Sequence, residues 1–140
     1  MQANLPGANW SVAPLRELIR HIVLEYHDCF RLEVPQLERG LPNAGLRALQ
    51  HSLDATLTQE EEKLFPAIRK CEEAADAGLD PPFRHANAVR YLIPVVTRNN
   101  DRLRALVREI IEQQSGALEV TEHIQLENEV LFPRALKLLS

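Results

Sequence analysis

The stretch "HIQLENEVLFPRAL", residues 123–136, has the residue pattern of an amphipathic helix. Its apolar residues recur at intervals of three and four, and Glu127 falls among them, on the side that should face a core. His123 lies four residues earlier, beside Glu127 on the same face. An ionised carboxylate in an apolar core must be neutralised, paired or bound to a cation. The stretch therefore predicts a buried helix that carries a polar or metal site.

A second stretch, "TLTQEEEKLFPAI" at 56–68, aligns without gaps with residues 123–135. Glu60 matches Glu127, the tripeptide "LFP" recurs whole, and Thr56 stands in the place of His123. An old duplication kept only for packing would leave the same echo. We expect the two stretches to take equivalent places in the fold, related by rough twofold symmetry, and to aim one carboxylate each into a shared core.

The apolar residues predict four helices, because they recur at three and four along the chain rather than alternating. The expected ranges are about 14–37, 43–75, 87–114 and 117–139. Asn43 is the expected cap of the second helix, and Pro94 should kink the third or reset its start. Four amphipathic helices with short links predict an all-α fold, an antiparallel up-down four-helix bundle. We expect one domain over residues 1–140, with 1–12 as an N-terminal extension.

The composition excludes several classes of protein. The net charge is −4, and the 16 basic residues form no stripe interleaved with aromatics, so we expect no nucleic-acid binding. No apolar run reaches the ~20 residues that span a bilayer, so we expect no membrane association. "MQANLPGANW" lacks the features of a signal peptide, and Cys29 and Cys71 share no CxxC spacing, so we expect free thiols and a cytoplasmic location. No nucleophile–base pair or phosphate loop supports enzymatic turnover.

Helical geometry, at about 100° per residue, indicates where each polar side chain points. Glu60 lies near the centre of a leucine stripe, and Glu127 sits amid the apolar residues of the last helix. His27 lies at the edge of the first helix's stripe and can reach inward, and Asn100 falls inside the apolar sector of the third. Four polar residues point away from these stripes and are expected at the surface: Glu61, Glu62, His21 and His51.

Each inward polar residue also has a purely structural explanation. A lone inward His is more often a hydrogen-bonded core residue than a ligand, and a single buried Glu is usually salt-bridged. Candidate cations for such a bridge are Arg31, Arg104 and Arg108. Paired inward Glu residues on two helices, with imidazoles alongside, match the way in which bundles build dinuclear metal sites. Spacing alone therefore leaves a metal site and a paired polar core as alternatives.

Several segments together resemble one family. "PLRELIRHIVLEYHDCFRLEVPQL" (14–37) is similar to the first helix of the hemerythrin-like (HHE cation-binding) family, and within it of the di-iron domain of the iron–sulfur-cluster repair proteins. "EEEKLFPAI" (60–68) resembles the second-helix motif of that family, and "PPFRHANAVR" (81–90) the segment before its third helix. "HIQLENEVLFPRAL" resembles its fourth-helix signature almost residue for residue.

The resemblance implies a set of metal ligands. His27 and His123 would be iron ligands, and Glu60 and Glu127 would be the two bridging carboxylates. The implied cofactor is non-haem iron, as one or two ions, and the implied partner is a small diatomic ligand, oxygen or nitric oxide. A homodimer is also possible.

The chain departs from the pattern of that family at three ligand positions. Thr56 stands where its second helix has a His, and Asn100 replaces the third-helix His. The connection after the first helix, "ERGLPNAGLR", has no His either. Two functions follow as hypotheses: a metal-binding protein with an incomplete di-iron site, in oxygen or nitric oxide response or iron handling, or a metal-free bundle that acts as a binding or regulatory module.

Overall fold

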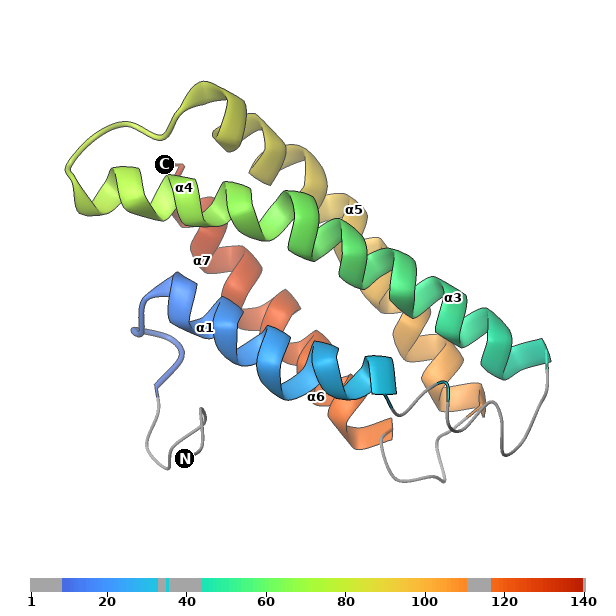
Figure 1. The fold of residues 1–140 in the computed structure, drawn as a ribbon. Helices are drawn as coiled ribbons and strands as arrows, with labels where there is room; N and C mark the ends of the chain where they lie inside the picture. Colours follow the sequence, from blue (N-terminus) through green and yellow to red (C-terminus); the bar gives the residue numbers. More distant parts are fainter. Residues whose placement is uncertain (1–8, 33–34, 36–43, 111–116, 140) are drawn as a thin grey trace.

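The computed structural model describes residues 9–32, 35, 44–110 and 117–139, and the regular structure of these residues consists of helices, with no strand (Figure 1). The first helical stretch is α1 (Leu15–Ile22), followed by the π-helical turn η1 (Val23–His27) and helical residues 28–32. The second comprises α3 (Ala44–Gln59), the π-helical turn η2 (Glu60–Leu64) and α4 (Phe65–Asp76). The third is α5 (Phe83–Ile110). The fourth comprises α6 (Ala117–Leu126), the π-helical turn η3 (Glu127–Leu131) and α7 (Phe132–Lys137).

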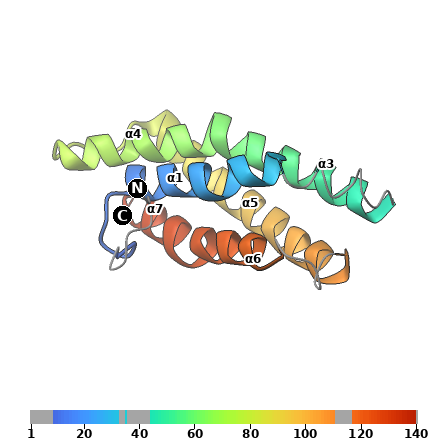
Figure 2. The ribbon, with the colours of Figure 1, turned by 60° about the horizontal axis from the view of Figure 1, so that its bottom comes forward.

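The four stretches pack side by side as a helical bundle, which confirms the predicted fold class at the level of an all-α bundle (Figures 1 and 2). The second stretch contacts α1 through α4 and contacts α5 along both α3 and α4. The fourth stretch likewise contacts α1 through η3 and α5 through α6 and α7. The two stretches that echo each other in sequence therefore take comparable places, each packed against both of the others.

The third helix begins earlier than predicted, and its start is not reset at Pro94. It starts at Phe83, because the turn after Pro82 lets the Pro82 carbonyl accept a hydrogen bond from the Ala86 amide at 2.9 Å. The helix neither stops nor restarts at Pro94. Pro94 and Arg90 are both exposed, so the Arg90 carbonyl, which loses its helical donor at Pro94, can be hydrated. The predicted cap Asn43 and the predicted end of the first helix near residue 37 lie outside the described residues.

The start of α1 is fixed by a carboxylate from another helix. Glu72 of α4 accepts hydrogen bonds from the backbone amides of Leu15 and Arg16, the latter at 3.0 Å, and its Oε1 lies 3.1 Å from the Arg16 guanidinium. Amides at a helix N-terminus have no partner within the helix, and a negative charge there is favourable. Glu72 therefore ties α1 to α4 at one end of the bundle.

His21 was expected at the surface, and this is wrong: its side chain is buried. The segment before α1 folds over it, and the ring of Trp10 stacks on the imidazole with 4.7 Å between centroids. Helical direction alone could not predict this, because the covering residue lies outside the helix.

Two apolar clusters make up the core. Each cluster contains buried residues from all four helical stretches, and the two clusters lie on opposite sides of the polar residues at the centre of the bundle. The first cluster contains Leu15, Leu18, Ile19, Ile22, Leu64, Phe65, Ala67, Ile68, Cys71, Val89, Leu92, Ile93, Val96, Leu131, Phe132 and Ala135. The second contains Phe30, Leu49, Leu53, Leu57, Leu103, Val107, Val120 and Ile124. On the second and fourth stretches, the boundary between the clusters falls at Glu60 and Glu127, so the polar residues are enclosed by apolar side chains from both directions.

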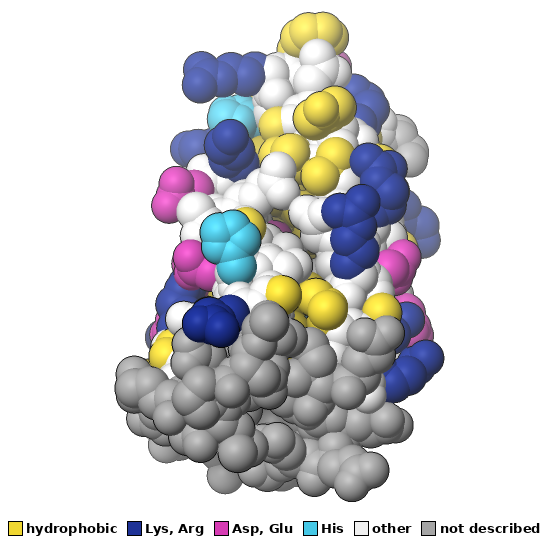
Figure 3. Space-filling view, turned by 90° about the vertical axis from the view of Figure 1, so that its right-hand side faces the viewer, with side chains coloured by type: hydrophobic (Ala, Val, Ile, Leu, Met, Phe, Trp, Pro, Cys, Tyr) yellow, Lys and Arg dark blue, Asp and Glu magenta, His cyan; other side chains and the backbone are white. Residues whose placement is uncertain are grey.

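The surface seen in Figure 3 has cationic side chains spread among apolar and uncharged ones. Among the described residues, no helix combines the length and the apolar character that a bilayer-spanning segment needs.

Candidate metal centre

Three π-helical turns mark the centre of the bundle, and each carries one of the predicted site residues. His27 is the last residue of η1, Glu60 is the first of η2 and Glu127 is the first of η3. In η2 and η3 the amide of the following Phe bonds to the Glu carbonyl five residues earlier. π-helical turns are rare and frequently occur at functional sites.

The repeated "LFP" explains why two of these turns form where they do. Pro66 and Pro133 have no amide hydrogen, so neither can make the normal bond to the carbonyl four residues earlier. Each proline lies in the first turn of the next α-helix, α4 or α7, where no intrahelical donor is needed. The sequence echo is therefore also an echo of backbone geometry, with each glutamate at the same place in its turn.

The structure brings all four predicted residues together. His27, Glu60, His123 and Glu127 are each 0% exposed, and one ligand atom from each lies within 4.8 Å of the others. His27 Nε2 is 3.1 Å from His123 Nε2 and 3.5 Å from both Glu60 Oε1 and Glu127 Oε2. His123 Nε2 is 2.9 Å from Glu127 Oε2. Side chains from three helical stretches thus converge on one point.

Glu61 completes the arrangement around His27, and its predicted place on the surface is wrong. Its Oε2 is 2.6 Å from His27 Nδ1 and 2.8 Å from the guanidinium of Arg31, and its side chain is only 25% exposed. The carboxylate accepts a hydrogen bond from Nδ1–H, so a neutral His27 presents the lone pair of Nε2 to the centre. Metal-binding histidines are usually held by such a carboxylate. The prediction assumed a regular α-helix, whereas Glu61 lies within a π-helical turn.

Arg31 also differs from its predicted role. It was a candidate to pair with a buried glutamate, yet it pairs with Glu61 at the edge of the site. The spacing of Arg31, four residues after His27, puts both side chains on one face of the first helical stretch, where a carboxylate such as Glu61 can pair with them.

Two of the three positions that lack a histidine, Asn100 and Thr56, are also buried. Asn100 of α5 is fully buried and donates from Nδ2 to Glu127 Oε1 at 2.8 Å and to Asn128 Oδ1 at 3.2 Å. Thr56 is buried, and its hydroxyl donates to the carbonyl of Ser52 at 2.9 Å. Asn100 therefore holds one oxygen of Glu127, and Thr56 bonds within its own helix.

Burial and neighbouring charges shift the pKa values of Glu60 and Glu127 in opposite directions. Burial first, and then the adjacent Glu127 carboxylate, raise the pKa of Glu60 well above its ordinary value. Burial acts to raise the pKa of Glu127 as well, but His123 and His27 outweigh it and hold that pKa well below the ordinary value. Without a cation, Glu60 would therefore keep its proton and Glu127 would be ionised.

The histidine and the outer carboxylate follow the same logic. Burial tends to lower the pKa of His27, but hydrogen bonds to Glu127 and Glu61 raise it overall. Burial tends to raise the pKa of Glu61, but His27 and Arg31 lower it to about 2. Glu61 is thus ionised at neutral pH, as a carboxylate that orients His27 must be.

The chemistry of the donors fits a metal ion. Two imidazoles and two carboxylates form a ligand set suited to iron and to other first-row transition metals. Within the described residues, both oxygens of Glu60 are buried without a hydrogen-bond partner, as is His123 Nδ1. Buried polar atoms are nearly always satisfied, so the Glu60 oxygens point to a missing partner. A cation at the convergence point would supply it.

Aromatic rings wall the site. The Phe65 ring stacks on His27, with 5.8 Å between centroids. Phe30 meets His123 edge-on at 5.3 Å, and Tyr26 lies 5.9 Å from the same imidazole. These rings limit the access of water to the ligand atoms, which strengthens electrostatic interactions inside.

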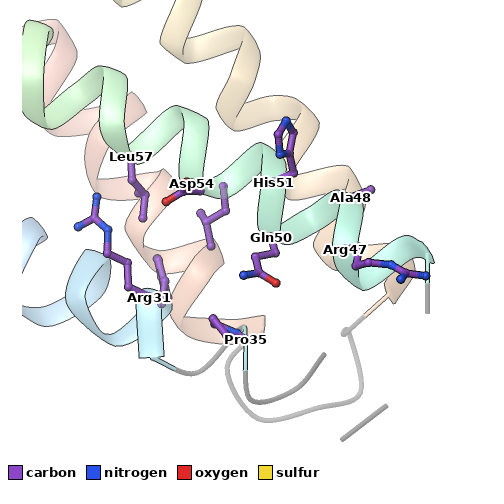
Figure 4. A pocket seen from close by; sticks show the side chains of 10 residues that line it. Arg31, Pro35, Arg47, Ala48, Gln50, His51, Asp54 and Leu57 are labelled. Carbon is purple, nitrogen blue, oxygen red and sulfur yellow. The ribbon is translucent and has the colours of Figure 1, made fainter. Parts of the chain in front are cut away.

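A separate cavity of about 780 Å³ lies between the end of the first helical stretch and α3 (Figure 4). Phe30, Leu53 and Leu57 give it an apolar lining, and Arg31, His51 and Asp54 supply polar groups. His51 is exposed, as predicted. The histidines and glutamates of the centre do not line this cavity, whereas Phe30 and Arg31 belong to both places.

Comparison with known proteins finds relatives among the iron-sulfur cluster repair proteins. No family model matches the sequence, and no solved structure matches it. The iron-sulfur cluster repair protein YtfE of Salmonella typhimurium is 31% identical over an alignment that covers 91% of this chain and 69% of the relative. The YtfE proteins of Salmonella paratyphi B and Salmonella newport match to the same extent. On this identity over most of both sequences, the chain belongs to the family of the iron-sulfur cluster repair protein YtfE.

Proposed function

We propose that this protein is a hemerythrin-like iron-binding protein, an antiparallel bundle in which His27, Glu60, His123 and Glu127 hold non-haem iron. One observation carries the proposal: two imidazoles and two carboxylates, all fully buried, bring ligand atoms within 4.8 Å of one another. The family of iron-sulfur cluster repair proteins, to which the chain belongs, supports iron over other metals.

The second candidate, a metal-free binding or regulatory module, is less well supported by the contacts at Glu60. Without a cation Glu60 would be protonated and would have the adjacent Glu127 carboxylate as an acceptor, but its second oxygen would stay buried with no hydrogen-bond partner among the described residues. Leaving such a group unsatisfied costs about 1–3 kcal/mol. The Glu61–Arg31 pair would also orient an imidazole that has no ligand to bind.

The four residues would have distinct tasks. Glu60 and Glu127 would neutralise the cation, while His27 and His123 would supply nitrogen donors. Glu61 would fix the tautomer of His27, with Arg31 holding Glu61 in place. Bound iron would supply redox chemistry and an attachment point for a small ligand.

We further propose that the ligand is oxygen or nitric oxide and that the protein acts in the cytoplasm in iron handling or repair. The name of its relatives, iron-sulfur cluster repair protein, supports a role of this kind. Spectral change on adding nitric oxide to iron-loaded protein would support the ligand assignment, and an unchanged spectrum would contradict it.

Metal analysis tests the proposal. We would produce the protein with ample iron and measure the iron-to-protein ratio for the natural chain and for Glu60→Ala and Glu127→Ala. Glu62→Ala is the matched control, because Glu62 is an exposed acid in the same π-helical turn as Glu60. We expect iron in the natural chain and the control, and loss in both other variants. Metal-free protein whose melting temperature does not change on adding ferrous iron would contradict the proposal and favour the regulatory module.

A further inference from the structure

We propose that the centre holds one metal ion and not the two that a di-iron site would contain. This inference rests on the proposed function, because it takes the same four residues as ligands. It is drawn from the distances among the ligand atoms, from what holds the second oxygen of Glu127, and from the charge that the core can accept.

The spacing of the ligand atoms suits a single ion. Metal–ligand distances of about 2.0–2.2 Å place neighbouring ligand atoms roughly 2.9–3.6 Å apart around one centre. The measured separations are 2.9 Å for His123 Nε2 and Glu127 Oε2, 3.1 Å for the two histidine nitrogens, and 3.5 Å from His27 Nε2 to each glutamate. Two ions would lie about 3.5–4 Å apart. Histidines assigned to different ions would then be expected farther apart than these two nitrogens are.

Glu127 is held in a way that disfavours bridging. A bridging carboxylate gives one oxygen to each ion. Here Oε2 faces the histidines, while Oε1 accepts a hydrogen bond from Asn100 Nδ2 at 2.8 Å. The amide orientation is fixed by its surroundings, because Nδ2 faces two acceptors, Glu127 Oε1 and Asn128 Oδ1. Asn100 therefore competes for the oxygen that a second ion would need.

A second ion would also lack ligands on its own side. With one ion, the centre offers four protein ligands. With two bridged ions, each ion would have a single imidazole. The family has further histidines at the positions of Thr56 and Asn100, and neither of these residues supplies a nitrogen donor. The Thr56 hydroxyl donates to the Ser52 carbonyl, and an amide or hydroxyl oxygen is a weak ligand for iron beside imidazole and carboxylate.

Charge favours one ion as well. One divalent cation and two carboxylates sum to zero, which suits a fully buried centre. Two divalent cations would leave an excess of two positive charges. The nearby carboxylate of Glu61 does not offset that excess, because it already pairs with Arg31 at 2.8 Å. Burying an uncompensated charge is strongly unfavourable.

Metal titration tests the number of ions. We would remove metal from the full chain, add ferrous iron without oxygen, desalt, and measure iron per chain; a parallel titration with Co²⁺ would follow the visible absorbance. We expect a ratio near one and a single break at one equivalent of Co²⁺. A ratio near two, or a break at two equivalents, would overturn the inference while leaving the proposed function standing. No bound metal would defeat the proposed function itself.

Variants test why the second ion is excluded. Asn100→His removes the bond to Glu127 Oε1 and adds a nitrogen donor, and Thr56→His adds one at the position that matches His123. We expect the double variant to bind about twice as much iron as the natural chain. Asn99→His, one residue away on α5, is the control and should stay at one.

The expected gain in bound iron requires that each variant folds, so we would check each variant by circular dichroism and by its melting temperature. A folded double variant that still binds one ion would overturn the role given to Asn100 and Thr56. As a separate readout that does not require these variants, electron paramagnetic resonance of the oxidised natural protein should show an isolated high-spin ferric ion. A silent spectrum from iron-loaded ferric protein, as a coupled pair gives, would overturn the single-ion assignment.

Discussion

The two echoing segments, residues 56–68 and 123–135, share a backbone and differ in electrostatics. Each begins a π-helical turn at its glutamate and continues through "LFP" into an α-helix. Glu127 lies 2.9 Å from His123 and accepts a hydrogen bond from Asn100, whereas neither oxygen of Glu60 has a hydrogen-bond partner among the described residues. The residue one turn before each glutamate, histidine in one segment and threonine in the other, accounts for much of this difference. Backbone symmetry therefore does not imply a symmetric site.

The largest effect on stability is expected from a substitution of Glu127, the glutamate with several polar partners. In metal-free protein, Glu127→Gln removes the charge that pairs with His123 and His27 in a fully buried site. Breaking a buried ion pair by changing one partner costs about 3–5 kcal/mol. Chemical denaturation of the metal-free variant should show a free energy of unfolding lower than that of the natural chain by on the order of 3 kcal/mol. A loss below about 1 kcal/mol would mean that Glu127 is not the ionised member of the pair.

The affinity for metal should depend next on Glu61. Glu61→Gln removes the carboxylate that holds His27 Nδ1, and outer partners of this kind typically change metal affinity by about 10–100-fold. We expect the dissociation constant for Co²⁺ to rise within that range, with the number of bound ions unchanged. Glu62→Gln, an exposed neighbour, should leave both quantities unchanged. Equal effects of the two substitutions would show that the Glu61–His27 contact does not support binding.

The matching substitution in the other segment should have little effect on stability. Glu60→Gln in metal-free protein replaces a protonated, neutral carboxyl by a neutral amide of the same shape, which can also donate to Glu127. We expect the free energy of unfolding to change by less than about 1 kcal/mol, in contrast to Glu127→Gln. Denaturation of both variants in the same buffer measures the difference. Equal losses would contradict the asymmetry between the two glutamates.

A last effect concerns pH. The pKa of Glu61 is lowered to about 2 in the folded protein, below its ordinary value of 4.5. A lowered carboxyl pKa contributes stability that is fully present above pH 4.5 and is lost as pH falls toward 2. As pH is lowered from 4.5 to 2, the melting temperature of metal-free Glu61→Gln should therefore fall less steeply than that of the metal-free natural chain. If the melting temperatures of the two proteins fell in parallel with pH, the contact of Glu61 with His27 and Arg31 would be contradicted.

Helical periodicity predicted most of the fold. The leucine and isoleucine stripes identified four helical stretches, and the second one, expected over about 43–75, spans 44–76 in the structure. Periodicity also placed Glu60 and Glu127 in the core, because both lie near the centre of an apolar face. The start of α5 was less predictable, since a helix can begin directly after Pro82 as readily as at a later residue.

The parts that the sequence did not predict share one cause. The directions of Glu61 and His21 were calculated from a regular, isolated α-helix. Glu61 lies in a π-helical turn, which changes the direction of its side chain, and His21 is covered by Trp10 from outside the helix. Local periodicity contains neither piece of information. The hydrogen bond from Asn100 to Glu127 is a contact between helices and required the structure as well.

Diffraction from crystals of the iron-loaded protein, recorded at the iron absorption edge, tests the central claim most directly. The account predicts one anomalous peak inside the bundle, about 2.0–2.2 Å from Nε2 of both His27 and His123 and from an oxygen of both Glu60 and Glu127. A peak elsewhere on the molecule, or no peak in protein that retains iron, would contradict the site. Two peaks among these four side chains would keep the site and contradict the single ion.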